Sequence, residues 1–293
     1  MTWLGLGDVA IDRIVDQDPL VIPQAMMFPA LDWSAVDAYS DALGAEHIDR
    51  SGRALLLSVH SYLLRTPRAN VLIDTCIGNH KRTGVAFFDG RASDYLARLA
   101  ARGLGPEDID AVLCTHLHAD HVGWNTRLAD GRWVPTFPNA RYIFARRELD
   151  YLESRLGGPD HGTSFDAVYR ESVLPILESR QADLVASDHE LEAGLWLEPA
   201  PGHTPGNVVV HLVSAKRHGI FTGDVVHHPV LVREPGWQPV FCADPQEAAD
   251  SRARLLDSLA DTDTLMLPAH FRGLTTGYVR SDGERLTFAF ERA

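Results

Sequence analysis

Short runs of β-branched and aliphatic residues recur along this chain, and most are bounded by Gly, Pro, Asn or Asp. Runs of four to eight such residues between turn formers are typical of β-strands. The pattern predicts strands over residues 54–64, 71–74, 111–115, 141–145, 208–213, 220–222 and 265–267.

Two segments between these runs have the apolar spacing of amphipathic helices instead. The first follows Ser93, the expected N-cap, and closes at Gly103. The second begins at Asp244, with Pro245 at the first helical position, where proline is favoured. Strands interspersed with helices predict an α/β protein in which helices cover the sheets.

The segment of residues 19–50 fits neither the strand nor the helix period well. It contains Met26, Phe28 and Trp33 in a stretch punctuated by proline. We interpret it as an ordered apolar loop. Simple packing over the core is the first alternative, and a lid or a homodimer contact is the second.

Composition and charge narrow the classes of protein. The 293 residues are 45% hydrophobic and 23% charged, which favours one globular domain over residues 1–293. The net charge of −13 disfavours nucleic acid and anionic membranes as partners. We expect a cytoplasmic location, because no apolar run of about 18 residues and no leader pattern is visible. The three cysteines lack CxxC spacing, which indicates reduced, buried thiols.

One run of six residues concentrates metal-type ligands directly after an apolar strand. It carries His116, His118, Asp120 and His121. In an extended segment residues two apart point to the same side, so the first two imidazoles can approach one ion. After a turn, the other two side chains can face a second ion. Imidazole and carboxylate are ligands that zinc and its neighbours prefer, and the run therefore predicts a metal site.

This run resembles the HxHxDH signature of the metallo-β-lactamase superfamily. Motifs similar to that family's later ones follow in the expected order and contain His203, Asp224 and His270. The resemblance spans roughly residues 54–271 and implies an αββα four-layer sandwich with two metal ions at one edge of the sheets. It assigns His116, His118 and His203 to the first ion, Asp120, His121 and His270 to the second, and Asp224 to both. Asp74, after the strand at 71–74, is a candidate partner for the free N–H of a ligand imidazole.

The resemblance implies a binuclear metal-dependent hydrolase. A metal-bridging hydroxide would attack a lactone or carboxylic ester, and Asp120 would pass a proton to the leaving alkoxide. Zinc is the expected metal, although iron, manganese and cobalt suit the same ligands. A phosphotriester hydrolase is the alternative within hydrolases. An iron-dependent oxidoreductase and a metal-stabilised binding protein are alternatives from other classes.

Apolar side chains and the lack of an assignable basic cluster favour a neutral, fairly apolar small molecule as substrate. The candidate pocket residues are Met26, Phe28, Trp124, His227 and Trp237. Trp124 could equally be a core residue that anchors its loop. His227 stands where acyl-homoserine lactonases carry a tyrosine, which implies a different substrate contact. This histidine and the next, His228, could also be solvated loop residues.

Overall fold

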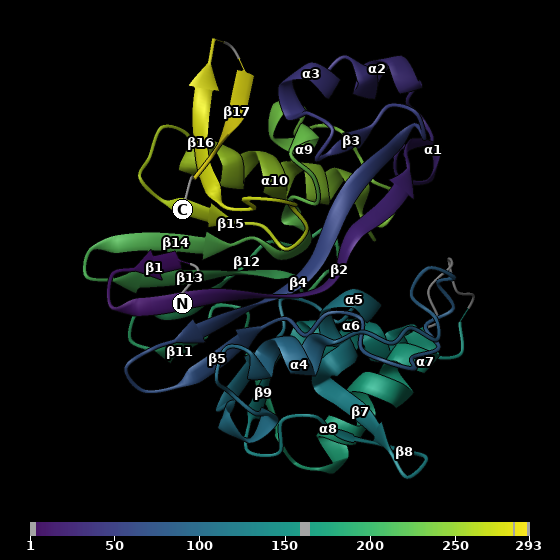
Figure 1. The fold of residues 1–293 in the computed structure, drawn as a ribbon, viewed down its shortest axis with the longest axis vertical. Helices are drawn as coiled ribbons and strands as arrows, with labels where there is room; N and C mark the ends of the chain where they lie inside the picture. Colours follow the sequence, from purple (N-terminus) through teal and green to yellow (C-terminus); the bar gives the residue numbers. More distant parts are fainter. Residues whose placement is uncertain (1–3, 159–164, 284, 292–293) are drawn as a thin grey trace. The chain divides into compact units, whose positions relative to one another are not determined.

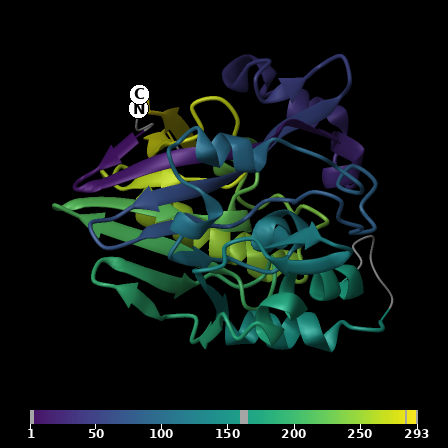
Figure 2. The same cartoon turned by 60° about the horizontal axis from the view of Figure 1, so that its bottom comes forward.

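The computed structural model describes residues 4–158, 165–283 and 285–291. The chain divides into two compact units, one of residues 1–17 and 59–189 and the other of residues 18–58 and 190–293. Strands β2 (Val9–Pro23) and β4 (Ala54–Arg65) each run from one unit into the other and lie side by side in Figures 1 and 2. One domain over residues 1–293 stays a prediction.

In the first unit a sheet of order β1-β2-β4-β5-β6-β9-β10 changes from antiparallel to parallel pairing after β5. Helix α6 packs against β9. The further strands of this unit are β1 (Leu4–Leu6), β5 (Asn70–Ile73), β6 (Ala111–Leu113), β7 (Thr126–Ala129), β8 (Arg132–Pro135), β9 (Arg141–Ala145) and β10 (Ala182–Val185). Its helices are α4 (Tyr95–Ala100), η1 (Pro106–Asp108), α5 (Ala119–Val122), η2 (Gly123–Asn125), α6 (Arg146–Ser154), α7 (Phe165–Val168), η3 (Tyr169–Val173) and α8 (Leu174–Glu178).

The second unit has a sheet of order β11-β12-β13-β14-β15-β16-β17, in which only the β14–β15 pair is parallel. Helix α10 packs against β16, as Figure 1 shows. The strands are β3 (Ile48–Asp49), β11 (Glu190–Glu192), β12 (Leu195–Pro199), β13 (Val208–Ser214), β14 (Arg217–Phe221), β15 (Leu265–Leu267), β16 (Gly277–Asp282) and β17 (Arg285–Phe290). The helices are α1 (Gln24–Met27), α2 (Trp33–Asp37), α3 (Ser40–Leu43), η4 (Gly223–Val225), α9 (Val230–Arg233) and α10 (Pro245–Leu259).

The parallel strand pairs β5–β6 and β14–β15 determine which loops lie next to each other. Strands that run parallel bring their carboxyl ends to the same edge of a sheet, where ligands bind in many α/β proteins. In the first unit β5 and β6 end together, and Asp74 N donates to Leu113 O at 2.9 Å. In the second unit β14 and β15 end together, and Thr222 N donates to Leu267 O at 3.2 Å. The motifs that contain His116, Asp224 and His270 therefore follow closely after the buried ends of β6, β14 and β15.

The predicted strands all exist, with ends shifted by up to three residues. The helix after Asp244 is confirmed, because the side chain of Asp244 accepts from the backbone N–H groups of Gln246 and Glu247. The expected N-cap at Ser93 is wrong, since α4 begins after Asp94. Ser93 is held elsewhere, by the carboxylate of Asp16 and the side chain of Asn79.

The interpretation of residues 19–50 as a loop without regular structure is also wrong. The segment contains the end of β2, the short helices α1, α2 and α3, and β3. Helices of four or five residues bury only one or two side chains, such as Met27 and Val36, which is too few for a visible period. All three cysteines are free and buried, as expected. No helix in the described ranges is long and apolar enough to span a membrane.

A buried imidazole makes the stability of the second unit depend on pH. His47 is 2% exposed and stacks on Phe290 at 5.2 Å between ring centroids. Burial, helped by the charge of Arg272, lowers its pKa to about 4. The unfolded chain, with a pKa of about 6.5, binds the proton more readily. The stability from neutral His47 is therefore complete above pH about 6.5 and is lost as the pH falls towards about 4.

We expect His47→Phe, which keeps an aromatic ring against Phe290, to lose less stability than the wild type on acidification. The difference should approach about 1 kcal/mol for each pH unit between about 6.5 and 4.5. Urea unfolding of both proteins at several pH values measures it. Equal losses for the two proteins would show that His47 does not carry this dependence.

Candidate metal centre

The ligand run of the first unit, His116 to His121, begins two residues after β6 and ends inside the single turn of α5. His116 and His121 are buried, and their ring centroids lie 4.0 Å apart. His118 lies beside them, with its ring centroid 4.6 Å from that of His116. Asp120 is in the first turn of α5, with 16% of its side chain exposed, and its Oδ2 lies 3.9 Å from His121 Nε2. The structure thus brings together the four side chains predicted from this run.

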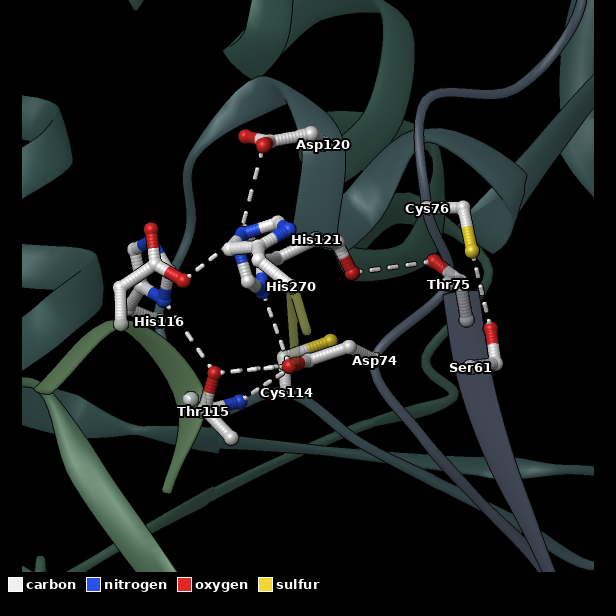
Figure 3. Close-up of polar contacts among 12 residues, drawn as sticks. Ser61, Asp74, Thr75, Cys76, Cys114, Thr115, His116, Asp120, His121 and His270 are labelled. Carbon is white, nitrogen blue, oxygen red and sulfur yellow. Dashed lines mark hydrogen bonds and ion pairs between the residues drawn. The ribbon is translucent and has the colours of Figure 1, made fainter. Parts of the chain in front are cut away.

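Asp74 fixes the orientation of this run from the end of β5, as Figure 3 shows. Its Oδ1 accepts a hydrogen bond from Thr115 N at 2.8 Å, and its Oδ2 accepts from Thr115 Oγ1 at 2.9 Å. Oδ2 also lies 2.8 Å from His121 Nδ1. A carboxylate accepts only, so Nδ1 carries the proton and Nε2 of His121 presents its lone pair. That lone pair is what a metal ion needs.

The second unit carries its own cluster around Asp224, which lies in η4 directly after β14. His270 Nε2 lies 2.9 Å from Asp224 Oδ1. His203 Nε2 and His227 Nε2 lie 3.3 and 3.2 Å from Oδ2. All four residues are at most 5% exposed. Three imidazoles therefore turn the same ring nitrogen towards one buried carboxylate.

The opposite nitrogens of two of these rings are held in place. His270 Nδ1 donates to Ser58 O at 2.9 Å, which leaves Nε2 as an acceptor. His203 Nδ1 lies 3.6 Å from Cys242 Sγ. Burial raises the pKa of this cysteine to about 12, so it is a thiol at neutral pH. Neither Ser58 nor Cys242 stands in a motif, so no sequence signal pointed to these contacts.

A close backbone approach positions His203. A Cβ on Gly202, whose φ is +123°, would lie 2.1 Å from Ala248 N in α10. Asp244 N donates to Gly202 O at 2.9 Å, and Ala243 N donates to His203 O at 2.9 Å. The start of α10 therefore holds the loop that presents His203, and only glycine fits at the contact.

The donor set suits divalent metal ions. In the described part of the chain, the side chains that could hold metal ions are His116, His118, Asp120 and His121 of the first unit and His203, Asp224 and His270 of the second. Neutral imidazoles and carboxylates are the ligands that zinc prefers. The fixed Nδ1 atoms are the outer contacts that ligand histidines usually have. The residues present in each unit fit divalent metal ions.

The other candidate residues have different surroundings. Trp124 is buried, stacks on Tyr95 at 5.2 Å and donates its indole N–H to Asp16 at 3.2 Å, which is the packing of a core residue. Phe28 is buried against Trp237 at 5.6 Å, whereas Met26 is 42% exposed.

The idea that His227 and His228 are solvated is wrong. Both are buried. His228 Nε2 donates to His47 O at 3.0 Å, and its Nδ1 accepts from Val230 N, so its contacts are with the backbone. His227 belongs to the Asp224 cluster instead. The two histidines are neighbours in sequence, but only one of them faces candidate ligands.

Residues 54–270 match the Metallo-beta-lactamase superfamily, and the chain belongs to that family. Solved structures agree on the fold. The hydrolase AbOPH of the beta-lactamase superfamily has a TM-score of 0.82 at 21% identity, over 99% of this chain and 97% of that chain. AidC, a dizinc quorum-quenching lactonase, has a TM-score of 0.78 at 20% identity, over 99% of this chain and 97% of that chain. The predicted fold class is confirmed.

Curated relatives are N-acyl homoserine lactonases. The chain is 28% identical over 171 residues to one from a Bacillus species, covering 53% of this chain and 58% of that protein. It is 26% identical over 181 residues to one from Bacillus cereus, covering 58% of this chain and 63% of that protein. The chain thus spans about three fifths of the length of these relatives.

Gly123, which follows the ligand run, allows a backbone approach that no other residue permits. Its N–H donates to Cys76 O at 2.7 Å, and a Cβ there would lie 1.8 Å from Ile77 O. We expect Gly123→Ala to destabilise the protein by about 1–3 kcal/mol, because backbone must move to relieve the clash. Gly5→Ala is the matched control, since its Cβ would meet nothing within 4 Å. Thermal unfolding that is unchanged in Gly123→Ala would contradict this account.

Proposed function

We propose that this protein is a binuclear metal-dependent hydrolase that opens a lactone or cleaves a carboxylic ester, with N-acyl homoserine lactones as the leading substrate class. The observation that carries the proposal is the pair of histidine and aspartate clusters whose fixed Nδ1 atoms leave Nε2 to bind metal. The similarity to N-acyl homoserine lactonases supports the substrate class.

In this proposal each ligand has the place that the family resemblance implies. His116, His118 and His203 would hold the first ion, Asp120, His121 and His270 would hold the second, and Asp224 would contribute to both. Asp74 orients His121. We propose zinc, which suits nitrogen and carboxylate ligands. Ions bound there would supply a water of lowered pKa and a Lewis acid for the substrate carbonyl.

Asp120 is the residue we propose for proton transfer. Its side chain is more exposed than those of Asp74 and Asp224, with 16% exposure against 5% for each of the other two. Asp74 is occupied by Thr115 and His121. Asp120 is therefore the ligand carboxylate best placed to take a proton from water and pass it to the leaving alkoxide.

His227 is the residue we propose to contact the substrate. Its Nε2 lies 3.2 Å from Asp224 Oδ2, and its ring is packed near that of Phe241, with centroids 6.5 Å apart. An imidazole N–H can donate a hydrogen bond to an oxygen that gains charge. Phe28 and Trp237, which pack on each other, and the exposed Met26 are the proposed apolar wall of the pocket. The core packing of Trp124 gives it no part there.

A hydrolysis screen tests the function. Zinc-loaded protein should open N-acyl homoserine lactones and cleave aryl esters. Asp224→Ala is the control: it should lose bound metal, since that carboxylate serves both ions, and lose activity with it. Phosphotriester cleavage without any lactone or ester cleavage, by protein shown to hold two ions per chain, would replace the proposed substrate class with the alternative.

Asp120→Asn separates the two proposed tasks of Asp120. The amide keeps the size and one ligating oxygen but cannot carry a proton at neutral pH. With excess zinc we expect most of the metal to remain and kcat on an alkyl lactone to fall by about 10²–10⁴. The loss should be smaller for a nitrophenyl ester, whose leaving group needs no proton. An equal loss on both substrates, at equal metal content, would leave Asp120 as a ligand only.

A further inference from the structure

Two further imidazoles, on strands β13 and β14 of the second unit, contact side chains of β12 and take no part in the proposed centre. His211 Nε2 lies 3.0 Å from Glu198 Oε2, and His211 Nδ1 lies 2.9 Å from His218 Nε2. His218 Nδ1 lies 3.2 Å from Thr264 Oγ1. The indole of Trp196 stacks on His211, with ring centroids 4.7 Å apart and an angle of 3°. Glu198, His211, His218 and Thr264 therefore form one polar network beside the indole ring of Trp196.

The proton positions in this network follow from the groups at its two ends, the Glu198 carboxylate and the Thr264 hydroxyl. The carboxylate of Glu198 only accepts, so His211 carries its proton on Nε2 and presents a lone pair at Nδ1. His218 then donates from Nε2 and accepts at Nδ1 from the hydroxyl of Thr264. A hydroxyl can also accept, so His218 can move its proton to Nδ1 without any movement of heavy atoms. Nε2 of His218 and Nδ1 of His211, which lie 2.9 Å apart, would then each present a lone pair.

We propose that His211 Nδ1 and His218 Nε2 form an accessory site for Cu²⁺ or Ni²⁺, with Glu198 as the carboxylate that orients His211. Two nitrogens that each lie about 2.0–2.1 Å from an ion at a right angle are about 2.9 Å apart. The observed separation is 2.9 Å. Right angles between neighbouring ligands are the geometry of square-planar Cu²⁺ and Ni²⁺, whereas tetrahedral zinc needs a wider separation.

The surroundings favour binding by these nitrogens. Burial lowers the pKa of both His211 and His218, so the imidazoles are neutral at pH 7 and do not have to lose a proton. His211 is buried, and the site lies close to the surface, because the Glu198 side chain is 59% exposed and Val213, the cross-strand partner of His218, is 38% exposed. Water would complete the coordination, as it does in sites with few protein ligands.

Copper titration of the zinc-loaded protein tests the site. Wild type should bind one more Cu²⁺ per chain than His218→Asn, and binding should quench the fluorescence of Trp196, which is next to the site. Trp196→Phe should lose that quenching and keep the extra ion. His80→Asn is the matched control, because His80 is an exposed histidine elsewhere and its loss should change neither readout. Any copper that replaces zinc at the proposed centre should do so equally in the wild type and in these three variants, so it cancels in the comparison.

Glu198→Gln supplies a second variant that is expected to fold, since the side chain is largely exposed. It should weaken copper binding by about 10-fold or more, the usual effect of removing a carboxylate behind a ligand imidazole. Equal copper content and equal quenching in wild type, His218→Asn and Glu198→Gln would overturn the proposal, and the polar network would then be a neutral support of the sheet. Lactone hydrolysis is independent of this outcome.

Discussion

The buried carboxylate of Asp74 is the contact on which the ligand run of the first unit depends. The residue has a left-handed backbone, with φ of 56°, which costs about 1–3 kcal/mol for a side chain other than glycine. Its carboxylate accepts from Thr115 at the start of the run and contacts His121 at the end of it. One side chain thus fixes both the path of the loop and the proton on an imidazole.

The second unit reaches a similar result with different groups. Parallel pairing of β14 and β15 brings Asp224 and His270 together, as parallel pairing of β5 and β6 brings Asp74 to Thr115. The outer contacts there are a backbone carbonyl of Ser58 and the thiol of Cys242. The fold therefore places the candidate ligands at the edges where parallel strands end. The groups that orient each imidazole differ from one loop to the next.

Hydrogen bonding separates the candidate ligand histidines from His228, whose contacts are structural. His121 and His270 each donate from Nδ1 to a protein oxygen. Their Nε2 atoms face the carboxylates of Asp120 and Asp224. Both ring nitrogens of His228 form hydrogen bonds with backbone groups. Burial lowers the pKa of His228 to about 3, so the ring is neutral at pH 7. Its neighbour His227 faces Asp224. A family resemblance fixes the fold but not the substrate.

The sequence determined the strands, the α10 cap and the candidate ligands, because period, turn residues and ligand spacing are local properties. It did not show the short helices of residues 19–50, whose few buried side chains leave no period. Only the tertiary structure decided that Ser58 and Cys242 stand behind His270 and His203, that Trp124 is core and that His227 is buried. These contacts join residues far apart in the sequence, and such pairs are determined by tertiary packing, which no local pattern records.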